Sequence, residues 1–331
     1  MVKWIVRPVL WGLGIFIQLW SFGVIYFCSF PSNPTAQKIS IFSYIALVVI
    51  FVLFSKKKTK ALLLSFIGYL AILVWFSSIE IPMGGIYPDN LVMPYADIRG
   101  EHIALHNVRN CNYRTKDDFD VRYETRKYDL EKLETLDVLI NYWGNELVSH
   151  AFLSFGFSDG QYVAVSIEIR PEVGESYGEF KGLFKQYEII YIWADERDLV
   201  GLRTNYKNED VYLYRTILNP EKVRLLFLSM IERTNDLYEH PEFYNTCTQS
   251  CTNTIGDHII KTGIEDLPFW KRRVLTGTTD KRLYNGAWIE GEGAFEALRT
   301  KSHINDSAKA AGKEKDFSSK IRMHLSSKDS Q

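Results

Sequence analysis

The chain begins with three apolar stretches. The first, residues 9–30, contains no charged side chain, and two more follow at residues 41–55 and 61–79. A helix that crosses a bilayer needs ~20 predominantly apolar residues, and the second stretch reaches that length if Ile39 and Ser40 are included. We therefore predict three transmembrane helices within residues 1–80. A secretory signal peptide is the alternative for the first stretch, but no small-residue cleavage pattern follows it.

The lysine and arginine residues predict how these helices are oriented. Lys3 and Arg7 precede the first stretch, and the turn between the second and third stretches reads "KKKTK" at residues 56–60. Loops that are rich in lysine and arginine stay in the cytoplasm. The N-terminus and this turn are therefore expected to be cytoplasmic. Everything after Glu80 is then expected outside, in the periplasm of a cell with two membranes.

Beyond residue 80 the pattern changes to alternating apolar and polar positions, which is typical of β-strands. The clearest example is a hairpin in which two β-rich segments flank a turn at Ser158-Asp159-Gly160. Further strands are expected in "HIALHNVRNCNYR", "DVRYETRKYDL", "LDVLINYW", "YEIIYIWAD" and "DVYLYRTIL".

Two helical segments complete this outer part, which we interpret as an α+β domain. The first follows Asn219, a good N-cap, with a proline in its first turn. The second is expected to begin near Cys251 and to end at Gly263, with Ile255 and Ile259 on its inner face. The predicted domains are a membrane anchor at 1–80, a catalytic domain at 81–300 and a polar tail at 301–331. The tail is expected to be loose unless its "DFSSKIR" segment docks.

Composition excludes one class of partner. The formal net charge is −1 and 24% of the residues are charged, with no dominant basic patch. We therefore expect no nucleic-acid partner. There is also no glycine-rich phosphate loop, so we expect no nucleotide cofactor.

The four cysteines leave several pairings open. Cys28 lies in the first apolar stretch, and Cys111, Cys247 and Cys251 lie in the outer part. Three outer cysteines cannot all pair within one chain, so at least one is free. A Cys247–Cys251 disulfide within one helical turn is geometrically awkward, whereas a Cys111–Cys247 bridge is feasible. A metal site that uses Cys247, Cys251 and His258 matches none of the common structural zinc spacings, so no metal is expected.

Cys251 has two readings. Free cysteines are often small buried hydrophobic residues. A thiol at the N-terminus of a helix can instead be a nucleophile, because the helix dipole and the unpaired N–H groups lower its pKa and can hold an oxyanion. A nucleophilic thiol needs a base, which is usually histidine. His258 lies two helical turns beyond Cys251, a rise of ~10 Å, which is too far for a direct hydrogen bond.

His150, at the start of the hairpin, is the better candidate base. If Ser158-Asp159-Gly160 forms a three-residue loop, His150 falls opposite Glu168, where a carboxylate would orient the imidazole. A two-residue turn would shift the register by one and place Ile169 opposite instead.

Four segments resemble the Lnb N-terminal periplasmic domain family of bacteria. They are "HAFLSFGFSDGQYVAVSIEIRPEVGESY", "GLFKQYEIIYIWADERDLVGLRT", "DVYLYRTIL" and "HPEFYNTCTQSCTNTI". The resemblance covers roughly Arg99 to Arg322, including "SHINDSAKAA" and "DFSSKIR". It implies a permuted papain-like fold, with a histidine on a strand before a cysteine on a helix.

The resemblance also implies which residues are catalytic. The family's cysteine follows a Tyr-Asn pair in an Asn-Cys-Thr-Thr-like motif, and counting from Tyr244-Asn245 places it at Cys251 rather than Cys247. Here Ser250 replaces the usual Asn, and Asn253 replaces one Thr. The family's histidine falls on His150.

The activity implied by the resemblance is cysteine acyl transfer at a bacterial inner membrane. A fatty acyl chain would move from a membrane phospholipid to the amino terminus of a diacylglyceryl lipoprotein, and the enzyme would be a multi-pass protein with a periplasmic catalytic domain. We expect Cys251 to be the nucleophile, His150 the base and Glu168 its orienting residue. An ion pair of Glu168 with Arg170 or Arg122 is the alternative role for that carboxylate. A papain-like hydrolase and a non-catalytic membrane scaffold are the alternative functions.

Overall fold

The computed structural model describes residues 2–30, 33–54, 58–81, 85–144, 146, 148–175, 177–264 and 276–325. The chain divides into two compact units. The first contains Met1–Gly84 together with Gly174–Glu188 and Phe243–Thr246, and the second contains Gly85–Val173, Ile189–Glu242 and Cys247–Gln331. The first unit thus extends beyond the predicted 1–80 boundary, because two later segments of the chain pack with its helices.

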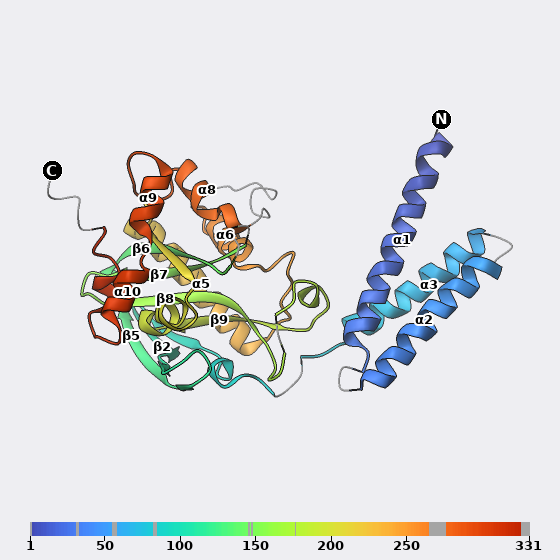
Figure 1. The fold of residues 1–331 in the computed structure, drawn as a ribbon, viewed down its shortest axis with the longest axis horizontal. Coiled ribbons are helices and arrows are strands. Elements are labelled where there is room, and N and C mark those ends of the chain that lie inside the picture. Colours follow the sequence, from blue (N-terminus) through green and yellow to red (C-terminus); the bar gives the residue numbers. More distant parts are fainter. Residues whose placement is uncertain are drawn as a thin grey trace. The chain divides into compact units, whose positions relative to one another are not determined.

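Three long helices form most of the first unit (Figure 1). They are α1 (Val2–Cys28), α2 (Pro34–Phe54) and α3 (Lys58–Ser77). The amide oxygen of Asn33 accepts a hydrogen bond from Ala36 N at 3.1 Å and so caps the start of α2. The Tyr44 hydroxyl of α2 donates to Gln18 of α1 at 2.5 Å.

Many apolar side chains of these helices are exposed in the structure. Within the described residues, no helix has the length and apolar character of a membrane span. The prediction of three transmembrane helices within residues 1–80 is therefore not supported here. Parts of the predicted spans, at residues 9–11, 51–55 and 61–62, fall on side chains outside the described set. The exposed residues include Leu13, Ile15, Phe16, Leu19, Ile39, Phe42, Leu47, Ile50, Leu63, Phe66, Ile67 and Val74.

The second unit is built on an eight-stranded sheet, in the order β1-β2-β9-β8-β7-β6-β10 with β5 paired to β2. The pairs β1–β2, β2–β5, β7–β8, β6–β7 and β6–β10 are antiparallel, and the pair β2–β9 is parallel. Each expected strand segment forms at least one strand. Successive side chains of a strand point to opposite faces of the sheet, and the alternating pattern matches this period. The strands are β1 (Tyr95–Arg99), β2 (His102–Arg109), β5 (Tyr123–Asp129), β6 (Leu133–Tyr142), β7 (Ser149–Phe157), β8 (Tyr162–Arg170), β9 (Glu188–Ala194) and β10 (Asp210–Arg215), and β3 (Asn112–Tyr113) pairs separately with β4 (Phe119–Asp120).

Helices cover both faces of this sheet, so the α+β fold class is confirmed (Figure 1). The Asn219 side chain caps α5 as predicted, accepting from Lys222 N at 3.0 Å. The helices of the unit are α4 (Glu196–Gly201), the π-helical turn η4 (Leu202–Tyr206), α5 (Pro220–Glu239), α6 (Cys251–Lys261), α8 (Thr279–Asn285), α9 (Phe295–Ser302), α10 (Asn305–Ala311) and α11 (Phe317–Lys320). Short 3₁₀ turns lie at η1 (Pro88–Asn90), η2 (Leu130–Lys132), η3 (Lys181–Leu183, in the first unit) and η5 (Thr276–Thr278).

The core has one layer on each side of the sheet. On one side Phe155 and Trp193 pack edge-on against Phe227 of α5, with ring centroids 4.9 and 5.4 Å away. On the other side buried residues of the sheet pack with those of α4, α10 and α11. This second cluster comprises Leu139, Phe152, Ala164, Ile190, Ile192, Ala194, Leu199, Val200, Val211, Leu213, Ile304, Ala308, Ala311, Phe317 and Ile321.

The hairpin register is the one predicted from a three-residue turn. Phe157 N donates to Gln161 O at 2.9 Å, and Gly160 has a φ of +85°. The pairing Leu153↔Val165 continues this register and leads to His150 opposite Glu168. Gly160 permits the left-handed conformation that a three-residue loop requires.

The predicted polar tail is packed over much of its length. Phe317 and Ile321 are buried, and Arg322 forms buried ion pairs with Asp137 and Glu196. The "DFSSKIR" segment therefore docks. Residues 326–331 lie outside the described residues.

Candidate active site

Cys251 is the first residue of α6 and is 9% exposed. The Ser250 hydroxyl caps the helix by accepting from Asn253 N at 3.4 Å, and the Asn253 amide in turn donates to Cys247 O at 3.1 Å. These contacts fix the turn that presents the thiol. The N–H groups of Cys251 and Thr252 lie in the first turn of α6, before Thr254 N, which donates to Ser250 O, so they are placed where a helix can hold an oxyanion.

His150 and Glu168 come together across the hairpin. Nε2 of His150 lies 3.2 Å from Oε1 of Glu168 and 2.6 Å from Oγ of Ser166. The Ser166 hydroxyl donates its proton to the same Glu168 oxygen at 2.6 Å. Toward His150 this hydroxyl is therefore the acceptor, and the donor is the Nε2–H group of His150. Since Nε2 is engaged on this side, Nδ1 is the ring nitrogen left for another partner.

The Cys251 thiol lies close enough to His150 for the two groups to shift each other's pKa. Burial raises the pKa of Cys251, but the charge and hydrogen bond of His150, with a backbone hydrogen bond from Ala151, bring it below the ordinary value. Burial likewise lowers the pKa of His150, but the negative charges of Glu168 and Cys251 raise it to about 10. The two groups therefore favour a thiolate–imidazolium pair, the reactive state of a cysteine nucleophile.

Arg203 is the cation that pairs with Glu168. Its Nη2 donates to Glu168 Oε1 at 2.6 Å, and its Nη1 donates to Leu199 O at 2.9 Å. Burial raises the pKa of Glu168, but His150 and then Arg203 hold it well below the usual range. The Arg203 guanidinium also lies 4.8 Å from the ring centroid of Phe152, which itself stacks beside His150.

The sequence did not predict Arg203, and the two arginines proposed as partners of Glu168 lie elsewhere. Arg170 donates to Asn90 O at 2.8 Å, and Arg122 pairs with Glu124 at 3.0 Å. Arg203 belongs to the π-helical turn η4, a distortion that is frequent at functional sites. The helix and strand patterns of the sequence do not indicate a π turn, so they could not predict the position of Arg203.

The other candidate ligands take structural roles. His258 is buried, and its two ring nitrogens bond to the Tyr191 and Ser229 hydroxyls at 2.8 Å each. All four cysteines are free, so no disulfide joins Cys111 to Cys247. Within the described ranges there is no group of three or more His, Cys, Asp or Glu side chains that could hold a metal ion.

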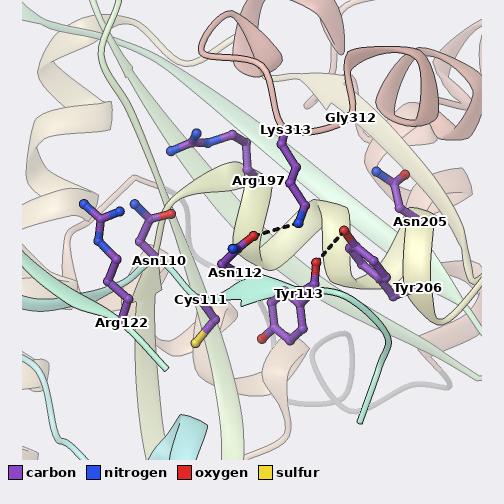
Figure 2. Close-up of a pocket in the computed structure, with 10 residues that line it drawn as sticks. All are labelled: Asn110, Cys111, Asn112, Tyr113, Arg122, Arg197, Asn205, Tyr206, Gly312 and Lys313. Atoms are coloured by element: carbon purple, nitrogen blue, oxygen red, sulfur yellow. Dashed lines mark hydrogen bonds between the residues drawn. The ribbon is translucent and has the colours of Figure 1, made fainter. Parts of the chain in front are cut away.

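A cavity of about 190 Å³ lies apart from these residues (Figure 2). Figure 2 shows Lys313 bonded to Asn112 and the Tyr206 hydroxyl bonded to Tyr113 O, so much of the polar lining is paired within itself. Cys111 is part of the lining, and burial raises the pKa of its thiol to about 11. Cys111 is therefore a poor nucleophile compared with Cys251.

Part of the chain is similar to one family model. Residues 119–276 match the family model described as the Lnb N-terminal periplasmic domain. This range contains Cys251, His150, Glu168 and Arg203. No curated protein and no solved structure matches the chain.

Proposed function

We propose that this chain is a membrane-bound cysteine acyltransferase that acts on the periplasmic side, a proposal supported by the match of residues 119–276 to the model of the Lnb N-terminal periplasmic domain. One observation carries the proposal. Cys251 begins a helix and lies close enough to His150 for the two groups to shift each other's pKa, and the His150 ring is held by Ser166 and Glu168. A thiol, an imidazole and a carboxylate in this order are the parts that acyl transfer through a covalent intermediate requires. A histidine on a strand that precedes a cysteine on a helix also fits a permuted papain-like arrangement.

The reaction has two steps. In the first, the Cys251 thiolate attacks the carbonyl carbon of a phospholipid ester, a C–S bond forms, and the C–O bond breaks. The leaving alkoxide takes the proton of the His150 imidazolium. In the second, the amino terminus of the acceptor attacks the thioester, a C–N bond forms, and the C–S bond breaks. The amine proton passes to His150 and the thiolate returns.

The proposed donor is a membrane phospholipid and the proposed acceptor is a diacylglyceryl lipoprotein. Both substrates are embedded in a bilayer, so an enzyme that is seated in the same bilayer meets them in two dimensions. The exposed apolar side chains of α1, α2 and α3 support this seating, because such a surface is costly in water. We place the protein in the inner membrane as a multi-pass protein, with the cytoplasmic side set by the lysine-rich turn.

Trapping the intermediate tests the proposal. Full-length protein in phospholipid nanodiscs is expected to carry an acyl group on Cys251 that hydroxylamine removes, as seen by mass spectrometry of the peptide. Cys251→Ala should abolish it. Cys247→Ser is the matched control, because Cys247 is exposed and lies four residues away, and it should leave the acylation intact. Equal loss in both variants would contradict the assignment of the nucleophile.

Transfer to a lipoprotein is the second half of the test. Lipoproteins from cells with the protein are expected to carry an amide-linked third acyl chain that is missing without it. Release of free fatty acid, with no change in the lipoproteins, would identify a hydrolase that uses water as the acceptor. An unmodified Cys251 under all conditions would indicate a non-catalytic scaffold.

A further inference from the structure

The segment Gly174–Glu188 joins β8 to β9 and packs in the first unit, against the ends of its helices. The Phe184 ring stacks on Phe27 of α1 with centroids 5.1 Å apart. A Cβ on Gly23 would lie 2.2 Å from Phe184 Cζ, so a glycine is required for this close approach. The Cys28 thiol donates to Phe184 O at 3.2 Å. Phe184 is therefore fixed at the C-terminal end of α1.

The next residue fixes the same segment to the end of α3. Lys185 Nζ donates to the carbonyls of Phe76 at 2.8 Å and Ser77 at 3.3 Å in the last turn of α3, and to that of Ile79, just beyond the helix, at 3.2 Å. A cation at this end complements the helix dipole. Since residues 184 and 185 contact α1 and α3 respectively, both helices end on the same side of the helical unit. This is the side predicted to face the periplasm.

The segment presents two aromatic side chains outward at this level. Phe180 is 72% exposed, the most exposed large apolar side chain in the described part of the chain. Tyr177 is 52% exposed and stacks on Tyr187 with centroids 6.3 Å apart. Phe180 is as exposed as the apolar residues on the helices themselves, such as Phe16 at 66%.

Hydrogen bonds from Thr246 hold the backbone on both sides of Phe180. Thr246 Oγ1 donates to Glu179 O at 2.8 Å, and Thr246 N donates to Gly182 O at 3.3 Å. A Cβ on Gly182 would lie 2.3 Å from Thr246 Oγ1, so the segments that contain these two residues are in tight contact. Phe180 thus lies between two fixed points, residues 179 and 182, rather than on a free end.

We propose that Gly174–Glu188 is a second membrane-contacting element, in which Phe180 and Tyr177 insert into the surface of the phospholipid bilayer that holds α1–α3. The inference rests on the membrane seating in the proposed function. Aromatic side chains favour the boundary between headgroups and acyl chains, and burial there removes the Phe180 ring from water. The surface is continuous with the helix ends through Phe184 and Lys185. Thr246, bonded to this segment, lies five residues before Cys251 in the sequence.

The depth of a spin label tests the contact. A nitroxide is attached at Phe180→Cys in the full-length protein that also carries Cys247→Ser and Cys251→Ala, which removes the exposed and the reactive thiol, in nanodiscs of phosphatidylethanolamine and phosphatidylglycerol. Matched labels are placed at Phe16→Cys on α1 and at Met323→Cys, which is 68% exposed in the second unit. Collisions with dissolved oxygen and with a water-soluble nickel chelate report lipid and water respectively. The labels at 180 and at 16 are both expected to collide less often with the nickel chelate than the label at 323 does.

The three labels separate the possible failures. Nickel accessibility at 180 equal to that at 323, with 16 protected, would overturn the loop contact and leave the membrane seating intact. Nickel accessibility at 16 as well would overturn both. As a functional counterpart, Phe180→Ser should slow Cys251 acylation by bilayer phospholipid several-fold and leave acylation by a soluble short-chain ester unchanged, whereas Met323→Ser should change neither. Equal loss with both esters, or loss with neither, would also overturn the contact.

Discussion

At the residue scale, the positions of Cys251, His150 and Glu168 follow from short-range rules. Gly160 sets the hairpin loop, the loop sets the register, and the register brings His150 to Glu168. The Ser250 cap sets where α6 begins. Arg203 did not follow from such rules, because its pairing with Glu168 joins residues 35 positions apart through a π turn. The catalytic roles of these residues stay predictions.

The charge coupling between Cys251 and His150 predicts how the thiol reacts with pH. The pKa of Cys251 is lowered below its ordinary value of 9.0 chiefly by His150, against burial. In a Cys247→Ser background, the rate at which iodoacetamide alkylates Cys251 should therefore reach half its maximum below pH 9.0. His150→Ala removes the charge that lowers the pKa of Cys251 and leaves the burial that raises it. The pH at which alkylation reaches half its maximal rate should therefore move above 9.0.

Peptide mass spectrometry measures this profile and supplies an internal control. Cys111, whose pKa burial raises to about 11, should react slowly and identically in both proteins. An unchanged Cys251 profile in His150→Ala would mean that the imidazole does not stabilise the thiolate.

At the element scale, the ends of α6 were predicted correctly and its buried face was not. We expected Ile255 and Ile259 to point inward, but both are half-buried, and the buried positions include Cys251, Thr254 and His258. Apolar spacing is a poor guide here because the buried face of α6 is polar. His258 is buried as a satisfied hydrogen-bonding group between β9 and α5, and only the tertiary structure supplies its two partners.

His258 predicts a loss of stability in acid. Burial, with smaller effects of Lys261 and Arg233, lowers the pKa of His258 from 6.5 to about 4. The unfolded chain therefore binds the proton more readily, and stability should fall as pH drops from 6.5 toward 4, by about 3 kcal/mol. His258→Gln should flatten this part of the curve, although it should also lower stability at neutral pH through weaker hydrogen bonds.

Denaturant unfolding of the full chain in nanodiscs at several pH values measures the slope. Ser229→Ala is the matched control: it removes one hydrogen bond of His258 and keeps the imidazole, so it should lower stability and keep the slope. If His258→Gln has the slope of the unsubstituted protein, the acid sensitivity arises elsewhere.

At the scale of the whole molecule, the α+β class could be predicted because strand and helix patterns are local. The permuted papain-like arrangement and the membrane seating stay proposals. The closure of the second unit by its C-terminal segment could not be derived from any pattern. Arg322 donates to Asp137 of β6 at 2.8 Å, across 185 positions of sequence. It also forms two hydrogen bonds to Glu196 of α4, at 2.8 and 2.6 Å, and lies over the ring of Tyr162 at 3.7 Å.

Through this network Arg322 joins the C-terminal segment to β6 and α4. The side chains of Asp137 and Glu196 are both 0% exposed. Arg322→Met would leave Glu196 without its cation and Asp137 with Arg215 alone. Removing one partner of a buried ion pair leaves an uncompensated charge, so we expect a loss of about 3–5 kcal/mol in the free energy of unfolding. Lys320→Met is the matched control, because Lys320 pairs at the surface with Glu314 and Asp316, and it should cost less than ~1 kcal/mol.

Hydrogen exchange distinguishes the stability of this network from simple loss of the tail. If the network closes the unit, Arg322→Met should increase exchange in β6 and α4 as well as in α11, because their carboxylates lose the shared cation. Adding Glu196→Gln to Arg322→Met should restore part of the stability, since the second change neutralises the charge that the first left unpaired. Faster exchange confined to α11, with no recovery in the double variant, would show that the C-terminal segment rests on the sheet without stabilising it.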